Sequence, residues 1–419
     1  MTKTLRSHFT NPETLFEIGH ETVVLLLEPH RAFLRAKGFH LPARSAAATI
    51  DLERIAVLLS ELDPQFPPEL AEAMYLIDEA SNPECGDRLN DAVARAGIVL
   101  KGDQNLSPAA LAALVWLRDP DLLRRSNAER VFQNRRKFDI FPRGNEGATQ
   151  IRLGKPALKA LSSSVKQWQI RHRRADVVVP IPLPAPPGEH LLALRSSGTF
   201  RSQGIVTAKG EPGRTQFRTL VYSCVRVRVA QGELHINAET GPKREMLRRA
   251  VGLALCGHED AWLRVPRYSL DLLRQGRDVL CCKNIDGLEK VELRTLGMES
   301  PDAFGYVDRV TGRDVYRALE AKQRTIADDD DLVHATFDAT FTGTATSKSA
   351  SLEPGGWSCS LSDEHEAILE EFFQRFRIDP DDSTLQRAAA TSRMGSNGVA
   401  VERAARRRAR PGTATPPAA

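Results

Sequence analysis

The 419-residue sequence lacks the features of several common protein classes. Its six cysteines form no CxxC pair, and together with the ten histidines they adopt no zinc-ligand spacing. The longest apolar run near the start, Val23 to Leu27, is far shorter than the roughly 18 residues of a membrane span, and no signal-peptide cleavage site follows it. We therefore expect a cytoplasmic protein with reduced cysteines and no association with a membrane.

Sequence motifs of common enzyme classes are also absent. There is no GxxxxGKS or GxxxxGKT phosphate-binding loop and no GxSxG nucleophile turn. The pair His365-Glu366 has Leu369 where an HExxH zinc site needs its second histidine. We therefore predict no catalytic residue, no metal and no cofactor. One alternative stays open, because Glu320-Ala321-Lys322 has the acid-x-lysine pattern of metal-dependent nucleases, although its surroundings predict a helix rather than a strand.

The first third of the chain has the pattern of short amphipathic helices. Each predicted start combines a capping residue or a first-turn proline with apolar residues at helical spacing. These starts lie at Asn11-Pro12, Asp51, Pro67-Pro68, Pro83 and Ser107-Pro108. We predict an all-helical domain over residues 1–136.

Residues 137–188 are predicted to form a basic junction that ends in a proline-rich connector. A helix is expected over 156–171, a short strand over 151–153 and a strand-like run over 177–181. Prolines occupy positions 180, 182, 184, 186 and 187. Because proline has no backbone N–H to donate, this segment must be an edge strand or an extended spacer.

From residue 189 onward the apolar pattern alternates. Residues 217–229 and 234–238 are predicted to form a hairpin around Gln231-Gly232. A helix over 242–257 and strands around 279–282 and 291–296 would complete an α+β domain over 189–300, and a strand over 333–341 with a following helix would extend it through 301–385. Residues 386–419 are predicted to be a disordered basic tail, because they contain few large apolar side chains. The predicted fold class is α+β, with the helical domain first and a mixed, strand-rich region after it.

Positive charge is concentrated in residues 124–174, here called the basic block, which begins at the end of the helical domain and continues into the junction. Residues 124–174 contain ten Arg and four Lys against three acids, whereas the preceding 123 residues contain eleven basic and eighteen acidic side chains. Such a local excess is typical of a surface that binds a polyanion. On a helix over 156–171, extended to Arg173, one stripe is basic and a neighbouring stripe is apolar. The basic stripe consists of Lys155, Lys159, Lys166 and Arg173, and the apolar stripe consists of Leu158, Leu161, Val165 and Trp168.

These patterns predict a non-catalytic nucleic-acid-binding protein, acting as a recognition or adaptor subunit of a larger intracellular assembly with other protein subunits. The cations would contact phosphates and the aromatic rings would stack on bases. The predicted nucleic-acid-binding residues are Arg124, Arg125, Arg135, Arg136, Lys137, Phe138, Lys159, Lys166, Trp168 and Arg173. Three alternatives stay open: pairing of these cations with the acidic helical domain, a protein-interaction scaffold that binds an acidic partner, and a divergent metal-dependent nuclease.

One face of the predicted hairpin also carries polar side chains. Its members are Arg218, Tyr222, Arg226 and Arg228, with His235 as a further candidate on the facing strand. Arginines and an aromatic ring on one sheet face would suit a single strand of nucleic acid. An ordinary solvated face is the simpler expectation, because alternation alone places polar residues there.

Overall fold

A computed structural model describes most of the chain in separate segments. The described residues are 9, 11–60, 65–100, 106–144, 151, 153–206, 212–300, 306–326, 330–359 and 363–378. The chain divides into two compact units, of which unit 1 comprises 1–134, 181–183 and 195–222, and unit 2 comprises 135–180, 184–194 and 223–419. The predicted disordered tail, 386–419, lies outside the described residues.

Unit 1 is built mainly from helices, as the sequence predicts. Asn11 Oδ1 accepts a hydrogen bond from the backbone N–H of Glu13 at 3.0 Å, and Asn82 Oδ1 accepts one from Cys85 at 2.8 Å. Such caps, with proline in the first turn of most helices, explain where these helices begin. The helices are α1 (Pro12–Ile18), α2 (His20–Leu27), α3 (Arg31–Ala36), α4 (Leu52–Ser60), α5 (Pro68–Ala80), α6 (Pro83–Arg95), α7 (Pro108–Arg118) and α8 (Pro120–Gln133), with 3-10 turns at Glu28–His30 and Arg44–Thr49. Their apolar faces share one core that includes Leu15, Leu34, Ile55, Leu76 and Leu123.

A first antiparallel sheet has the strand order β1-β5-β4-β3-β2. Its strands are β1 (Asp139–Pro142), β2 (Val178–Leu183), β3 (Glu189–Val206), β4 (Pro212–Arg228) and β5 (Glu233–Asn237). The predicted hairpin is confirmed, with Val225 opposite Ile236 and Gly232 at φ 59° in the turn. The proline-rich strand β2 lies at the edge of the sheet, where missing N–H donors cost least.

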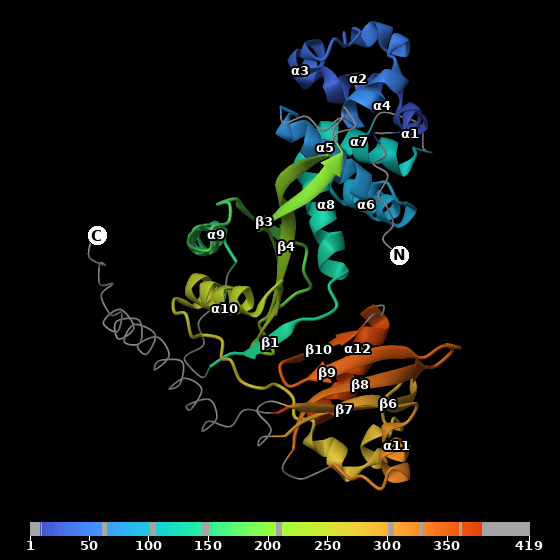
Figure 1. Cartoon of the computed structure of the whole chain (residues 1–419). Helices are drawn as coiled ribbons and strands as arrows, with labels where there is room; N and C mark the ends of the chain where they lie inside the picture. The colour runs from blue at the N-terminus through green and yellow to red at the C-terminus, as the bar shows by residue number, and fades with distance from the viewer. Residues whose placement is uncertain are drawn as a thin grey trace, which may run out of the picture. The chain divides into compact units, whose positions relative to one another are not determined.

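Two helices cover one face of this sheet within unit 2. They are α9 (Lys155–Arg171) and α10 (Gly241–Cys256), which lie side by side in Figure 1 and contact each other. Leu161 and Val165 of α9 share a core with Leu247 and Val251 of α10 and with the strands. Gly257 ends α10 in the left-handed region at φ 85°, as a C-terminal cap does.

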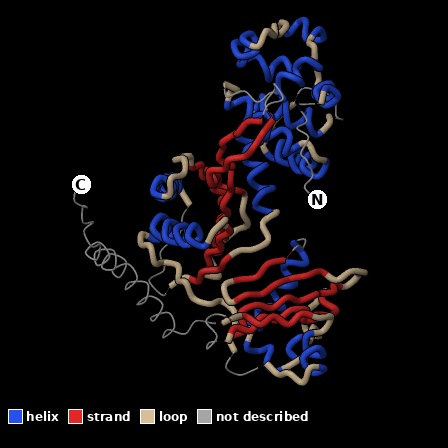
Figure 2. Tube along the Cα trace, viewed as in Figure 1, coloured by secondary structure: helices blue, strands red, loops and turns tan. Residues whose placement is uncertain are grey.

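A second antiparallel sheet also lies in unit 2 and has the order β10-β9-β8-β6-β7 (Figure 2). Phe337 of β8 packs against Phe372, Phe373 and Phe376, which explains the phenylalanine cluster near the end of the described chain. The elements are β6 (Leu288–Glu299), β7 (Val307–Thr311), β8 (Asp331–Phe341), β9 (Lys348–Glu353), β10 (Gly356–Cys359), α11 (Val315–Ala321) and α12 (Asp363–Phe373), with 3-10 turns at Asp271–Gln275, Arg277–Leu280 and Gln374–Phe376.

Two predicted strands are wrong. The segment 279–282 enters a 3-10 turn instead, and Arg375 donates hydrogen bonds from Nη1 to the carbonyls of Val279 and Cys281 at 2.5 and 2.9 Å. These carbonyls are therefore satisfied by a side chain rather than by a neighbouring strand. Ile151 and Leu153 do not belong to a strand either, although Ile151 is buried in the core beside α9. Among the described helices, none has the length and apolar character needed to cross a bilayer.

Candidate nucleic-acid interface

Helix α9 carries four basic residues and no acidic residue along its 17 positions. Leu161, Val165 and Gln169 are buried, and this buried face packs against α10 and the first sheet. The packing fixes the rotation of the helix about its own axis. The side that carries Lys155, Lys159 and Lys166 therefore faces solvent.

The three lysines of the predicted basic stripe lie together on α9, but the predicted extension of the helix to Arg173 is wrong, because α9 ends at Arg171 and Arg173 follows its cap with φ 55°. Lys155, Lys159, Lys166 and Arg173 are all exposed, and none of them forms an ion pair within the described segments. Lys155 stands at the positive end of the helix dipole, and Lys155 and Lys159 repel each other at i,i+4 spacing. The stripe thus carries an electrostatic cost that a bound polyanion would relieve.

Trp168 is held by its neighbours at the end of α9. Its ring stacks on His172 with centroids 4.1 Å apart, and the Arg174 guanidinium lies 5.2 Å from the Trp168 ring. Arg174 in turn pairs with Glu239 at 3.1 Å. These contacts give half-buried Trp168 a structural role at the helix end.

The first part of the basic block is occupied by ion pairs inside unit 1. Arg124 binds Glu72 of α5 with two hydrogen bonds, from Nε at 3.1 Å and from Nη2 at 2.8 Å. Arg195 of β3 binds the same carboxylate, and Arg130 binds Glu79. Burial alone would raise the pKa of Glu72, but the hydrogen bonds from Arg124 and Arg195 outweigh burial and lower it. Arg124 therefore has a structural role, because its ion pair with Glu72 connects α8 to α5 and, through Arg195, to β3.

The remaining predicted residues differ in their surroundings. Arg125 is about half exposed, 3.8 Å from Asp119, and Lys137 pairs with Glu353 at 2.6 Å. Arg135 is exposed and interacts with the Cys224 thiol, whose pKa is raised to about 11, chiefly by burial. Arg136 is exposed without an ion pair in the described chain, whereas Phe138 is half-buried with its ring centroid 6.5 Å from that of His235. The ten predicted residues thus include paired and unpaired cations, with Arg124 and Arg125 in unit 1 and the others in unit 2.

The predicted solvated face of the hairpin is wrong, because most of this face is covered. Tyr222 and His235 are buried, and Arg228 lies between Glu189 and Glu370 in unit 2. Glu233, on β5, is buried and accepts hydrogen bonds from Arg267 at 3.0 Å and Arg377 at 2.6 Å. Burial would raise the pKa of Glu233, but its hydrogen bond with His235 and the nearby arginines lower it. The alternating pattern in the sequence distinguishes the two faces of the hairpin, but it does not show whether other parts of the protein cover the polar face.

The nuclease pattern is placed on the surface of a helix. Glu320 lies on α11 with its side chain 73% exposed, 4.0 Å from Arg277. No group of three potential metal ligands occurs among the residues that the structure describes. Asp314 lies 3.1 Å from the same Arg277 guanidinium, so an arginine rather than a divalent ion is shared by these two carboxylates.

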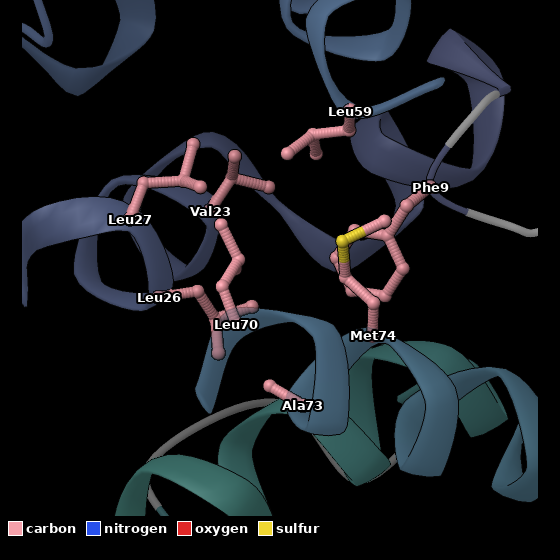
Figure 3. A pocket seen from close by; sticks show the side chains of 8 residues that line it. All are labelled: Phe9, Val23, Leu26, Leu27, Leu59, Leu70, Ala73 and Met74. Atoms are coloured by element: carbon pink, nitrogen blue, oxygen red, sulfur yellow. The ribbon is translucent and has the colours of Figure 1, made fainter. Parts of the chain in front are cut away.

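The enclosed cavity drawn in Figure 3 is an apolar packing gap in unit 1. Its walls come from Phe9, α2, α4 and α5, with the side chains of Leu59, Leu70 and Met74 facing it. Its volume of ≈ 10 Å³ leaves room for about one water molecule, and its described lining residues are all apolar. Such a space suits neither a substrate nor a cofactor.

Comparison with known proteins gives no functional guide. No protein-family model matches the sequence, and no curated protein matches it significantly. The crystal structure of the di-domain ARO/CYC StfQ from the steffimycin biosynthetic pathway aligns with 65% of this chain and 100% of that chain. The sequence identity is 10% and the TM-score is 0.11, so this likeness supports no conclusion about fold or activity.

Proposed function

We propose that this protein binds nucleic acid without catalysis, and that the α9 stripe of Lys155, Lys159 and Lys166, with Arg173 just beyond the helix, contacts the phosphates. The observation that carries the proposal is the exposure of these four cations without an internal carboxylate in the described chain. A role as the recognition or adaptor subunit of a larger assembly would use such a surface to hold the nucleic acid.

The dimensions of the stripe suit a phosphate backbone. At 1.5 Å per residue, the eleven steps from Lys155 to Lys166 span roughly 16 Å along the helix axis. One strand of B-form DNA places a phosphate about every 3.4 Å along its axis, so this length faces about five phosphates. Lysine stems are flexible enough for the ammonium groups to reach alternate phosphates along that length.

The test is a salt titration with fluorescence anisotropy. The full chain and the variant Lys155→Gln, Lys159→Gln, Lys166→Gln are titrated into labelled mixed-sequence duplex DNA, and into single-stranded DNA and RNA, between 50 and 300 mM salt. We expect the magnitude of the log affinity versus log salt slope to fall by about 2.7 on duplex and about 2.1 on single strands, because each lost phosphate contact removes about 0.9 or 0.7.

A matched variant separates the stripe from net charge. Lys283, Lys322 and Lys348 are exposed lysines elsewhere in unit 2, without ion pairs in the described chain. Their triple replacement by Gln changes the net charge equally and should leave more of the slope intact. Absence of binding by micromolar protein at low salt would overturn the proposal, and so would equal losses in the two variants. Tighter binding to polyglutamate than to nucleic acid would favour the protein-interaction scaffold instead.

A further inference from the structure

The strands β3 and β4 continue in unit 1 as a two-stranded ribbon that contains residues 199–206 and 212–220, here called the arm. Residues 199–204 are all exposed, and so are Pro212, Arg214, Arg218 and Leu220. Because consecutive residues of a strand point to opposite faces, both faces of the arm are open to solvent. A lone two-stranded ribbon is marginally stable in water, so this exposed arm needs an explanation.

The arm is basic and carries exposed apolar groups. Its sequence contains Arg201, Arg214 and Arg218 and no acidic residue, and none of the three arginines has an ion pair in the described chain. The Phe200 ring is 54% exposed, with the Arg218 guanidinium 5.7 Å from its centroid. Arg214 donates a hydrogen bond to Ser202 across the ribbon. Arg214 and Arg218 are thus held along the arm by neutral partners, and no described carboxylate pairs with the three arginines.

The base of the arm is anchored to the helices of unit 1. Glu72 of α5 binds Arg195 of β3 and Arg124 of α8 at once. Asn127 of α8 donates a hydrogen bond to the hydroxyl of buried Tyr222 at 3.3 Å, so β4 is tied to the same helix. The internally paired arginines of the basic block thus have a structural role. They help to fix the base of the arm, beyond which the exposed arginines lie.

From these observations, and resting on the function proposed above, we infer that the arm is a second nucleic-acid contact that enters a groove of duplex DNA. The major groove, about 12 Å wide, admits a two-stranded ribbon whose strands lie about 4.8 Å apart. A ribbon inside a groove has a phosphate-lined wall on each side, which matches an arm exposed on both faces with cations on both strands. A single strand laid on a sheet would use one face and would leave the other without a partner.

The test compares three variants of the full chain on a 30-base-pair duplex and on the single strand of the same length. In the arm variant, Arg201, Arg214 and Arg218 are replaced by Gln. In its control, the exposed residues Arg35, Arg95 and Arg118 of unit 1 are replaced by Gln. The third is Phe200→Ala. We expect the arm variant to lose about 2.7 of the salt slope on duplex and far less on the single strand, and Phe200→Ala to weaken duplex binding without changing the slope.

The outcomes distinguish this inference from the proposed function. If the wild-type protein binds and the α9 variant weakens binding while the arm variant matches its control, the arm inference fails and the proposed function stands. Equal losses on duplex and single strand would also overturn it, because the arm would then not require a groove. If neither nucleic acid binds the wild-type protein, the proposed function itself is wrong.

Discussion

Removal of the Glu233 charge should destabilise unit 2 far more than removal of a surface carboxylate. The Glu233 side chain is 4% exposed and is 2.9 Å from Arg267, whose side chain is 5% exposed. Arg377, 21% exposed, binds the same oxygen at 2.6 Å. Glu233→Gln keeps the side-chain shape but leaves a guanidinium buried without a carboxylate.

The expected loss in the free energy of unfolding depends on how deeply each arginine is buried. Breaking a buried ion pair by neutralising one partner costs about 3–5 kcal/mol, because the remaining charge cannot return to water. Arg377 can be partly hydrated, so most of the loss arises from Arg267. Glu353 provides the control, because it is 38% exposed and its partners are Lys137, 51% exposed, and His334 at 3.6 Å. Glu353→Gln should cost roughly 0–1 kcal/mol.

Urea unfolding, followed by far-UV circular dichroism and tryptophan fluorescence, measures the free energy of unfolding of each variant. Unchanged m-values would show that the variants expose the same surface on unfolding as the wild-type protein. The double variant Glu233→Gln, Arg267→Met should recover part of the loss, because it removes the stranded charge. A Glu233→Gln cost no larger than that of Glu353→Gln would refute the reasoning. So would a double variant less stable than the single one.

Two further predictions concern unit 2. A Cβ at position 252 of α10 would lie 2.7 Å from the His258 carbonyl oxygen and 3.0 Å from that of Glu259. Gly252→Ala should therefore lower the free energy of unfolding by about 1–3 kcal/mol despite the helix preference for Ala, and a thermal melt showing stabilisation would contradict the close approach. Burial lowers the pKa of His235 below 6.5, although Glu233 opposes the shift. Below about pH 6.5 the unfolded chain therefore binds a proton at His235 that the folded chain does not bind. The free energy of unfolding should decrease as the pH is lowered through this range, by at most ~1.4 kcal/mol per pH unit from this group. His235→Asn should flatten that part of the profile, and an unchanged slope between pH 6.5 and 5.5 in urea unfolding would exclude His235 as the cause.

Local signals in the sequence predicted local structure well. Asn11 and Asn82 cap the helices that follow them, because a cap involves only residues two or three positions away. The alternation along β8 likewise reflects one buried face, with Ala335, Phe337 and Ala339 fully buried. Strands β9 and β10 gave no comparable signal. They are short and serine-rich, and their register becomes evident only beside β8.

Charge in the sequence did not reveal which cations are paired. Arg124 lies 52 positions from Glu72, and Arg228 lies 142 positions from Glu370. No local pattern connects such residues, so a basic block in the sequence contains both structural cations and exposed ones. Arg218 of the arm was noted on the hairpin face, but Arg201 and Arg214 were missed because they lie outside the dense basic segment and their exposure depends on how far the ribbon continues beyond Tyr222.

Two carboxylates beside α9, Glu239 and Glu245, bind arginines and not the lysines of the helix. On the adjoining α10, Glu245 binds Arg248 at 2.8 Å and Arg249 at 2.9 Å. Just before that helix, Glu239 binds Arg174. Both acids therefore pair with arginines, and neither forms an ion pair with the described lysines of α9. An external polyanion is then the partner that would neutralise the stripe, and this makes the salt dependence of binding the decisive measurement.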